Sequence, residues 1–194
     1  MYNELIKGSK INNQDRIFYQ FDAFEKTKLN TLVEHIKKVS KPYFDCGVFP
    51  QPEEPILNRK VWDIVLDNSP IIHSFYEHLD RISTKANKMY GFDIDYLNTL
   101  KYVENGESDN NLDWHTDIGI NQFVGRKLSF SIIVTDNYEG GKLEINSNNK
   151  NTQIPTVIGG IAMFPSFLLH RVTKVKKGTR GIITGMWAGN KPYR

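Results

Sequence analysis

The sequence contains few of the features that mark secreted or membrane-bound proteins. Cys46 is the single cysteine among 194 residues, so neither an intrachain disulfide nor a cysteine metal cluster can form. No stretch approaches the roughly 20 apolar residues of a membrane helix, and residues 1–7 contain no apolar run of a secretory signal. These absences predict a cytoplasmic protein with no membrane partner.

An excess of charge of one sign is also missing. The chain has 25 basic and 22 acidic residues and a net charge of +3. Its tightest basic cluster, Lys174, Lys176 and Lys177, falls at a predicted turn. Nucleic-acid-binding domains usually concentrate positive charge on one face, so no nucleic acid partner is expected. Hydrophobic residues at 39% and aromatic residues at 12% are sufficient for a packed core.

The first 92 residues favour helices. Residues 22–39 carry apolar side chains at nearly helical spacing, and Asp22 with Glu25 has the spacing of a capping box. Residues 69–89 form a second predicted helix, with Ser69 as N-cap and proline in the first turn. Residues 41–58 hold four prolines and predict a loop, either a connector or a cover over a site.

From residue 93 short apolar or alternating runs are separated by Gly, Asn and Asp, which predicts a β-sandwich or barrel. We expect one domain over residues 1–194. Its class is α+β and mainly β, with helical support in residues 1–92 and a strand-built core in residues 93–190. The predicted strands are 96–103, 113–117, 127–135, 142–145, 153–158, 160–164, 169–175 and 181–187.

Two of the five histidines stand out from the other three, which lie on the predicted helices. His115 and Asp117 form a His-x-Asp pair on a predicted strand, where residues two apart project from the same face. His170 lies on a later predicted strand. Two imidazoles and one carboxylate form the facial triad of non-haem Fe(II) oxygenases. A His-x-Asp pair alone is common by chance, and a strand histidine is usually a core residue, so the argument rests on the whole set.

Arg180 lies ten residues after His170, beyond the turn signal Lys176-Lys177-Gly178. A three-residue hairpin loop here predicts that His170 lies opposite Thr184 and that Arg180 and Thr184 share its face. Arg180 would then lie about 13 Å along the strand, where a five-carbon diacid could bridge from the metal to the guanidinium. A two-residue loop would place His170 and Arg180 on opposite faces. Tyr102 is a second candidate for the distal carboxylate, or simply a packed strand residue.

These residues resemble the prolyl 4-hydroxylase-like superfamily of 2-oxoglutarate/Fe(II) dioxygenases, and within it the PKHD-type hydroxylases. The resemblance covers residues 95–190 approximately. It rests on the motifs Trp-His-Thr-Asp at 114–117, Leu-Ser-Phe-Ser-Ile-Ile-Val at 128–134, Tyr-Glu-Gly-Gly-Lys-Leu at 138–143, Phe-Pro-Ser at 164–166, His-Arg-Val-Thr at 170–173, Gly-Thr-Arg at 178–180 and Trp187.

The resemblance implies a double-stranded β-helix, or jelly roll, in which His115, Asp117 and His170 bind Fe(II). It implies that Arg180 binds the 5-carboxylate of 2-oxoglutarate, while Tyr102 matches the upstream strand tyrosine only loosely. O2 would be the oxidant, ascorbate the reductant, and succinate and CO2 the co-products. Related halogenases lack the carboxylate, so Asp117 favours hydroxylation.

The expected substrate is an amino acid side chain, free or in a peptide or protein, with proline as the best single guess. Three alternatives remain open. One is an oxidative demethylase of nucleic acid or small molecules, although that group carries its paired arginines further downstream. The second is a catalytically idle jelly-roll binding module, and the third is a non-redox enzyme that binds zinc through the same ligands.

Overall fold

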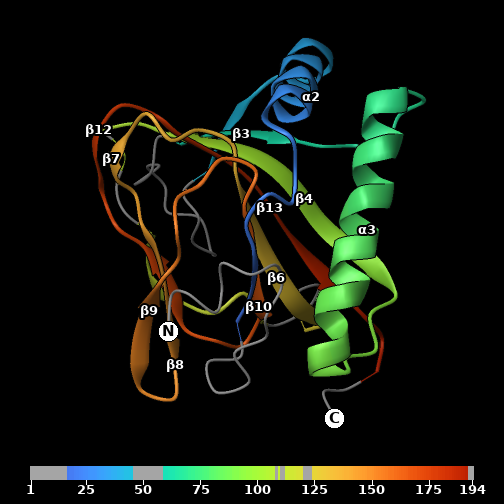
Figure 1. The fold of residues 1–194 in the computed structure, drawn as a ribbon, viewed down its shortest axis with the longest axis vertical. Coiled ribbons are helices and arrows are strands. Elements are labelled where there is room, and N and C mark those ends of the chain that lie inside the picture. Colours follow the sequence, from blue (N-terminus) through green and yellow to red (C-terminus); the bar gives the residue numbers. More distant parts are fainter. Residues whose placement is uncertain (1–16, 46–58, 108, 110–111, 120–123, 192–194) are drawn as a thin grey trace.

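A computed structural model of the chain describes residues 17–45, 59–107, 109, 112–119 and 124–191. Two antiparallel sheets dominate it (Figure 1). The large sheet contains, in spatial order, β1 (Phe18–Gln20), β10 (Ile161–Pro165), β6 (Arg126–Ile133), β13 (Arg180–Ala188), β4 (Tyr96–Asn105), β3 (Arg59–Asp63) and β2 (Tyr43–Asp45). The small sheet contains β5 (Leu112–His115), β11 (His170–Val172), β8 (Leu143–Ser147) and β9 (Lys150–Gln153). A two-stranded ribbon joins β12 (Val175–Lys177) to β7 (Glu139–Gly140).

The two sheets pack against each other. Leu143 and Ile145 of the small sheet share a buried cluster with Ala162 and Phe164 of the large sheet. Side chains alternate between the two faces of a strand, so each strand of the large sheet has one face toward the small sheet, which we call the inner face. This arrangement confirms the predicted jelly roll of the mainly β class.

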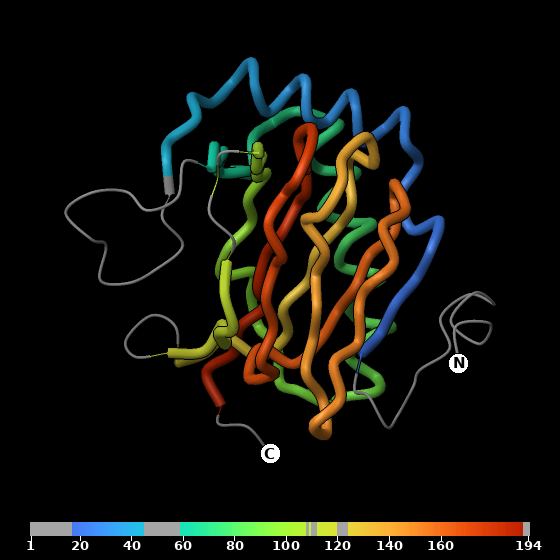
Figure 2. Tube along the Cα trace, turned by 90° about the vertical axis from the view of Figure 1, so that its left-hand side faces the viewer, coloured from blue at the N-terminus to red at the C-terminus, as the bar shows by residue number. Residues whose placement is uncertain are grey.

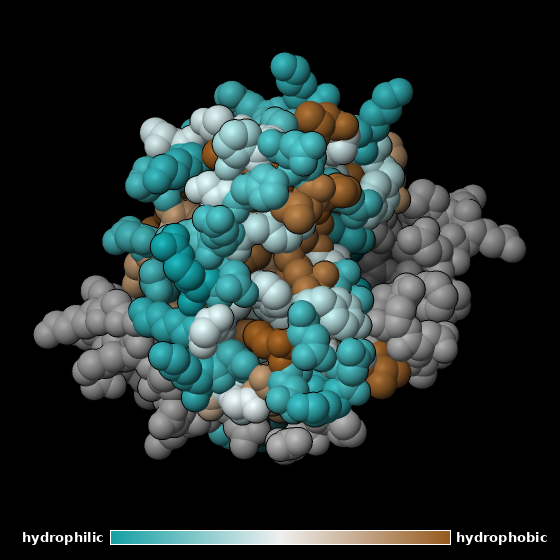
Figure 3. All heavy atoms as spheres, turned by 90° about the vertical axis from the view of Figure 1, so that its right-hand side faces the viewer, coloured by the Kyte–Doolittle hydropathy of each residue, from teal (hydrophilic) through white to brown (hydrophobic). Residues whose placement is uncertain are grey.

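The opposite face of the large sheet is covered by α2 (Lys26–Val39) and α3 (Pro70–Tyr90) (Figure 1). The buried stripes of both helices pack on alternate strand residues such as Leu100, Phe130 and Ile183. We call this the helix face. The surface that carries α3 is largely hydrophilic, with hydrophobic side chains in small groups (Figure 3). Neither described helix has both the length and the hydrophobicity that crossing a lipid bilayer requires.

The helix boundaries agree with the sequence at α3 and differ at α2. Ser69 precedes α3 at the N-cap, Pro70 opens it, and Gly91 ends it in the left-handed region at φ 67°. The predicted capping box is wrong, because Glu25 rather than Asp22 occupies the N-cap of α2 and makes no side-chain cap hydrogen bond. The N–H of Phe24 still donates to the carbonyl of Gly159, which holds this segment against the sheet.

The first 92 residues also supply three strands that the sequence did not predict. In Figure 2 the blue N-terminal segments lie across one end and along one edge of the sheet strands. β1 forms one edge of the large sheet, and β3 and β2 extend the other. The predicted loop therefore contains the edge strand β2, while its remaining residues 46–58, with Cys46 and three of its prolines, lie outside the described residues.

The predicted strand at 153–158 is largely wrong, because β9 ends at Gln153. Asn148 and Asn149 both have positive φ, 52° and 61°, and form a two-residue turn that pairs Ser147 with Lys150. Such turns need positive φ at both central residues and favour asparagine there. Because of this turn, β9 begins at Lys150, before the apolar residues on which the predicted strand at 153–158 was based.

Candidate functional site

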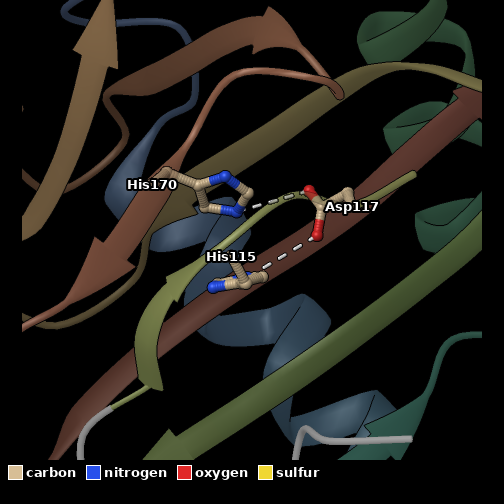
Figure 4. Close-up of side chains that lie close together, drawn as sticks. All are labelled: His115, Asp117 and His170. Carbon is tan, nitrogen blue, oxygen red and sulfur yellow. Dashed lines mark ion pairs between the residues drawn. The ribbon is translucent and has the colours of Figure 1, made fainter. Parts of the chain in front are cut away.

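Three side chains meet where the small sheet faces β6 (Figure 4). His115 ends β5, His170 begins β11, and these two residues are direct partners in the ladder. Nε2 of His115 lies 3.8 Å from Oδ1 of Asp117, and Nε2 of His170 lies 3.5 Å from Oδ2. One ligand atom from each residue falls within a 4.8 Å cluster. The structure thus brings together the three residues that the sequence singled out.

Asp117 reaches this cluster by a different route from the one predicted. It lies two residues beyond the end of β5, so the alternation of a continuous strand does not place it. Its N–H instead donates to the carbonyl of Ser166 at 2.9 Å. The loop after β5 is therefore fixed to the segment after β10, which directs the carboxylate toward both imidazoles.

Both imidazoles are oriented by the backbone. Nδ1 of His115 lies 2.7 Å from the carbonyl oxygen of Asp113, and Nδ1 of His170 lies 2.9 Å from that of Leu168. A carbonyl accepts only from an N–H, so each neutral ring carries its proton on Nδ1 and presents a free lone pair on Nε2. This is the tautomer that binds a metal ion through Nε2.

The environment of His115 also favours its neutral form. Burial lowers the pKa of His115 most, and the neighbouring His170 lowers it further. The Asp113 carbonyl and the Asp117 carboxylate oppose these effects. Two imidazole nitrogens and one carboxylate oxygen in one cluster fit Fe(II) and leave adjacent coordination positions for other ligands.

Asp117 is held by side chains that the sequence interpretation missed. The Ser129 hydroxyl donates to Oδ2 at 2.5 Å and lies 2.8 Å from the Ser166 hydroxyl. Arg126 donates to the Asp117 carbonyl at 3.3 Å, and also to Asn98 and Thr99. Ser129 and Ser131 alternate with apolar residues in β6, and this polar period of two was a usable signal for the inner face.

Replacing Ser129 with alanine should weaken metal binding about 10- to 100-fold, because groups that orient metal ligands typically contribute this much. The measurement is Fe(II) titration of the variant protein under nitrogen. Ser147→Ala is the matched control, since Ser147 is equally buried but lies at the end of β8. Equal Fe(II) affinity in the two variants would show that Ser129 does not orient the carboxylate.

Arg180 lies on the inner face, but not in the predicted hairpin. β13 pairs with β4 and β6, whereas β11 pairs with β5 and β8, so Arg180 and His170 belong to different sheets. The predicted pairing of His170 with Thr184 is therefore wrong. Thr184 does share the face of Arg180, as predicted, but its hydroxyl donates to the carbonyl of Phe130 at 2.8 Å.

The Arg180 side chain is 2% exposed. Burial lowers its pKa, while the hydrogen-bonded Tyr138 phenol raises it. A Cβ on Gly141 would come within 2.8 Å of Arg180 Cδ, so the Gly-Gly turn lets the backbone close over the guanidinium. No acidic side chain of the described residues forms an ion pair with Arg180.

Arg180 Nε and the Ser131 hydroxyl, both on this face, have no hydrogen-bond partner within the described residues. Buried donors are rarely left unsatisfied, so both suit a polar ligand. Between them lies the apolar cluster of Ile133, Ile182, Val61 and Val103. Polar groups at either end of an apolar patch fit a short dicarboxylate such as 2-oxoglutarate.

Tyr102 does not join this group. It belongs to the helix-face cluster with Trp62, its ring lies 5.5 Å from Nζ of Lys37, and its hydroxyl donates to Glu104 at 2.7 Å. Residues one apart on β4 point to opposite faces, so Val103 faces inward and Tyr102 faces the helices. The structure therefore supports packing of Tyr102 rather than contact with the carboxylate.

Comparison with known proteins agrees with this geometry. Residues 97–188 match the family model of the 2OG-Fe(II) oxygenase superfamily. The chain carries a 2OG-Fe(II) oxygenase superfamily domain. Its matched segment includes all three clustered residues and Arg180, which confirms the resemblance seen in the sequence. The superfamily uses Fe(II), 2-oxoglutarate and O2.

Curated relatives of this chain are PKHD-type hydroxylases. The protein from Synechococcus sp. (strain CC9311) is 35% identical over 135 residues, which cover 67% of this chain and 50% of that protein. The protein from Crocosphaera subtropica is 37% identical over 76 residues, covering 37% of this chain and 34% of the relative. The chain thus spans about half of one relative's length and a third of the other's.

Solved structures share the fold at low identity. A prolyl-4-hydroxylase from Pseudomonas putida aligns with a TM-score of 0.71 at 14% identity, covering 91% of this chain and 94% of that one. A prolyl hydroxylase from Trichoplax adhaerens, in complex with a hypoxia inducible factor peptide fragment, aligns with a TM-score of 0.73 at 16% identity. That alignment covers 91% of this chain and 84% of the other.

Proposed function

We propose that residues 1–194 act as one domain that hydroxylates an amino acid side chain, free or in a peptide or protein, at the expense of 2-oxoglutarate and O2. The observation that carries the proposal is the combination of the three clustered ligand atoms at the small sheet with a buried arginine on the inner face of the large sheet. The PKHD-type relatives support the reaction class. Succinate and CO2 are the co-products, ascorbate the reductant and the cytoplasm the location.

His115, Asp117 and His170 would hold Fe(II), and Arg180 would hold the distal carboxylate of 2-oxoglutarate. When bound, the iron supplies the oxidative decarboxylation of 2-oxoglutarate and the activation of O2. The chain contributes orientation and the exclusion of water. The Asp113 and Leu168 carbonyls keep the protons of both imidazoles on Nδ1, and Ser129 holds Oδ2 of Asp117, which leaves Oδ1 for the metal.

Succinate formation tests this proposal directly. Wild-type protein with Fe(II), 2-oxoglutarate and ascorbate under air should form succinate slowly without substrate, and His170→Ala should form none. His35→Ala is the matched control, because His35 pairs with Asp67 on the helix side of the molecule. Absence of succinate, together with absence of Fe(II) and 2-oxoglutarate binding, would leave an idle jelly-roll module as the better description.

A further inference from the structure

One half of β4 has a strand neighbour on a single side. β13 pairs with β4 along its length. β3 pairs only with residues 101–104 on the other side, and its last pair is Asp63 with Lys101. Among the described residues no strand continues this ladder beside residues 96–99. The backbone N–H and C=O groups that point to that side therefore form an open sheet edge.

The chain leaves β4 at this point because it turns toward α3. The Ile64 N–H still donates to the carbonyl of Leu100, but the Ile64 carbonyl accepts from the hydroxyl of Tyr76 at 3.2 Å. The next two residues, Val65 and Leu66, are 70% and 54% exposed. A hollow of about 380 Å³ lies between this segment and β4, and residues of both sheet faces line it. A hollow with exposed apolar side chains thus lies directly beside the open edge.

The open edge is linked to the candidate metal site by a bulge in β4. The register of β4 against β13 shifts at Asn98, which has no ladder partner in β13. Asn98 and Thr99 both accept from the Arg126 guanidinium, at 2.8 and 2.9 Å. Arg126 also donates to the carbonyl of Asp117 at 3.3 Å. Bulges often occur beside active sites, where they re-aim side chains. Residues of the open edge therefore contact a group that supports a candidate iron ligand.

Strand spacing gives the distance from the edge to the metal site. Thr99 and Ser129 lie in one row, since both pair with Met186. Neighbouring strands are about 4.8 Å apart, so a strand added at the edge would lie about 15 Å from Ser129, which donates to Asp117. About five extended residues, at about 3.3 Å each, cover that distance. A chain docked at the edge can therefore present a side chain a few residues away to the metal site.

We propose that the open edge at residues 96–99 binds an extended segment of the substrate as an additional strand, so that the substrate is a peptide or protein chain rather than a free amino acid. This inference rests on the proposed function and adds the docking mode of its substrate. An extended backbone supplies the repeating N–H and C=O groups that pair with an open edge, while its side chains enter neighbouring pockets. A small molecule has no such repeat. The hollow beside Val65 and Leu66 takes a side chain of the docked segment.

The first test compares substrates of different length on the iron-loaded full chain with 2-oxoglutarate under air. The probes are a pool of random dodecapeptides with acetylated and amidated ends, and the twenty L-amino acids, both free and as N-acetyl amides. At equal residue concentration the pool should raise succinate formation about 10-fold more than the single amino acids do, because two or three backbone hydrogen bonds contribute about this much. Mass spectrometry then identifies the peptides that gained one oxygen atom, and the most abundant is resynthesised.

The second test locates this peptide on the protein. Under nitrogen, with iron and 2-oxoglutarate bound, the peptide should slow hydrogen exchange at residues 96–99. Val65→Asp should lower kcat/KM for the peptide about 10-fold, as expected when one valine-sized apolar contact is lost, and Val65→Thr, which keeps the shape, should lower it less. Val39→Asp is the matched control, because Val39 is also exposed but ends α2. Circular dichroism confirms that the variants fold.

Each of four results would overturn the inference alone. They are stimulation by single amino acids as strong as by the pool, an uncoupled rate that no probe raises, unchanged exchange at residues 96–99 with an active peptide, and equal losses in Val65→Asp and Val39→Asp. A dimer without peptide, seen by light scattering and dissociated by Val65→Asp, would assign the edge to a second copy of the chain instead. A wild-type protein that neither forms succinate nor binds 2-oxoglutarate would overturn the proposed function as well, and that result is seen before any peptide is added.

Discussion

Asp117→Ala and His115→Ala should each lower Fe(II)-dependent succinate formation by more than about 100-fold. Partners that only orient a metal ligand typically contribute 10- to 100-fold, so loss of a ligand atom should exceed that range. Asp117 supplies the sole carboxylate of the cluster, and its two oxygens lie 3.8 Å and 3.5 Å from the two imidazole Nε2 atoms. Without it, two neutral nitrogens would face a divalent cation.

The measurement pairs Fe(II) titration under nitrogen with the succinate assay under air. Asp113→Ala is the matched control, because its carboxylate is two residues from His115 and hydrogen-bonds to the backbone N–H of Trp114 rather than joining the cluster. It should retain wild-type metal affinity. Iron-dependent turnover that survives Asp117→Ala would contradict the assignment of this carboxylate as a ligand.

The sequence was sufficient to find the three clustered residues. A His-x-Asp pair keeps its two side chains within a few ångströms whatever the exact end of the strand, so His115 and Asp117 lie close together although β5 stops at His115. His170 was found because it lies on the predicted strand at 169–175 and begins the motif His-Arg-Val-Thr. Its direct pairing with His115 in the small sheet is a contact across 55 residues, and no local pattern encodes that register.

Local reasoning failed where the chain changes sheets. A turn signal before Arg180 suggested that it and His170 belong to one hairpin, but β12 pairs with β7 and β13 moves to the large sheet. The inward direction of Arg180 therefore follows from its ladder with β4 and β6, not from the hairpin. The sequence also did not show which face of the sheet Tyr102 occupies. Both Tyr102 and Val103 suit a strand, and only the position of the helices shows which of the two side chains faces them.

The short strands of the N-terminal part were missed for another reason. β1 and β2 have three residues each and β3 has five, too few for a periodic pattern to emerge from the sequence. They are strands because the edges of the large sheet offer backbone partners. The large sheet therefore could not be extended to β3 until the pairing of β3 with β4 was known.

Arg180→Ala should raise the KM for 2-oxoglutarate by about 100-fold or more, since a bidentate pair consists of two charge-assisted hydrogen bonds, each contributing about 1.5–3 kcal/mol. Arg180 is the largest fully buried side chain of the inner face, so its truncation also leaves a void. Arg180→Lys fills most of that space and keeps the charge. It should fold normally and show a smaller rise in KM, because an ammonium group cannot make the paired contact.

Arg171→Ala is the matched control for both variants. Arg171 lies nine residues before Arg180 in the chain. Its guanidinium, however, pairs with Glu144 at 2.7 Å and lies over the Trp114 ring. The measurement is succinate formation as a function of 2-oxoglutarate, with circular dichroism to confirm folding. An unchanged KM in a folded Arg180→Lys variant would remove Arg180 from the cosubstrate site. The Ser131 hydroxyl, a buried group without a hydrogen-bond partner among the described residues, would then be the next group to test on this face.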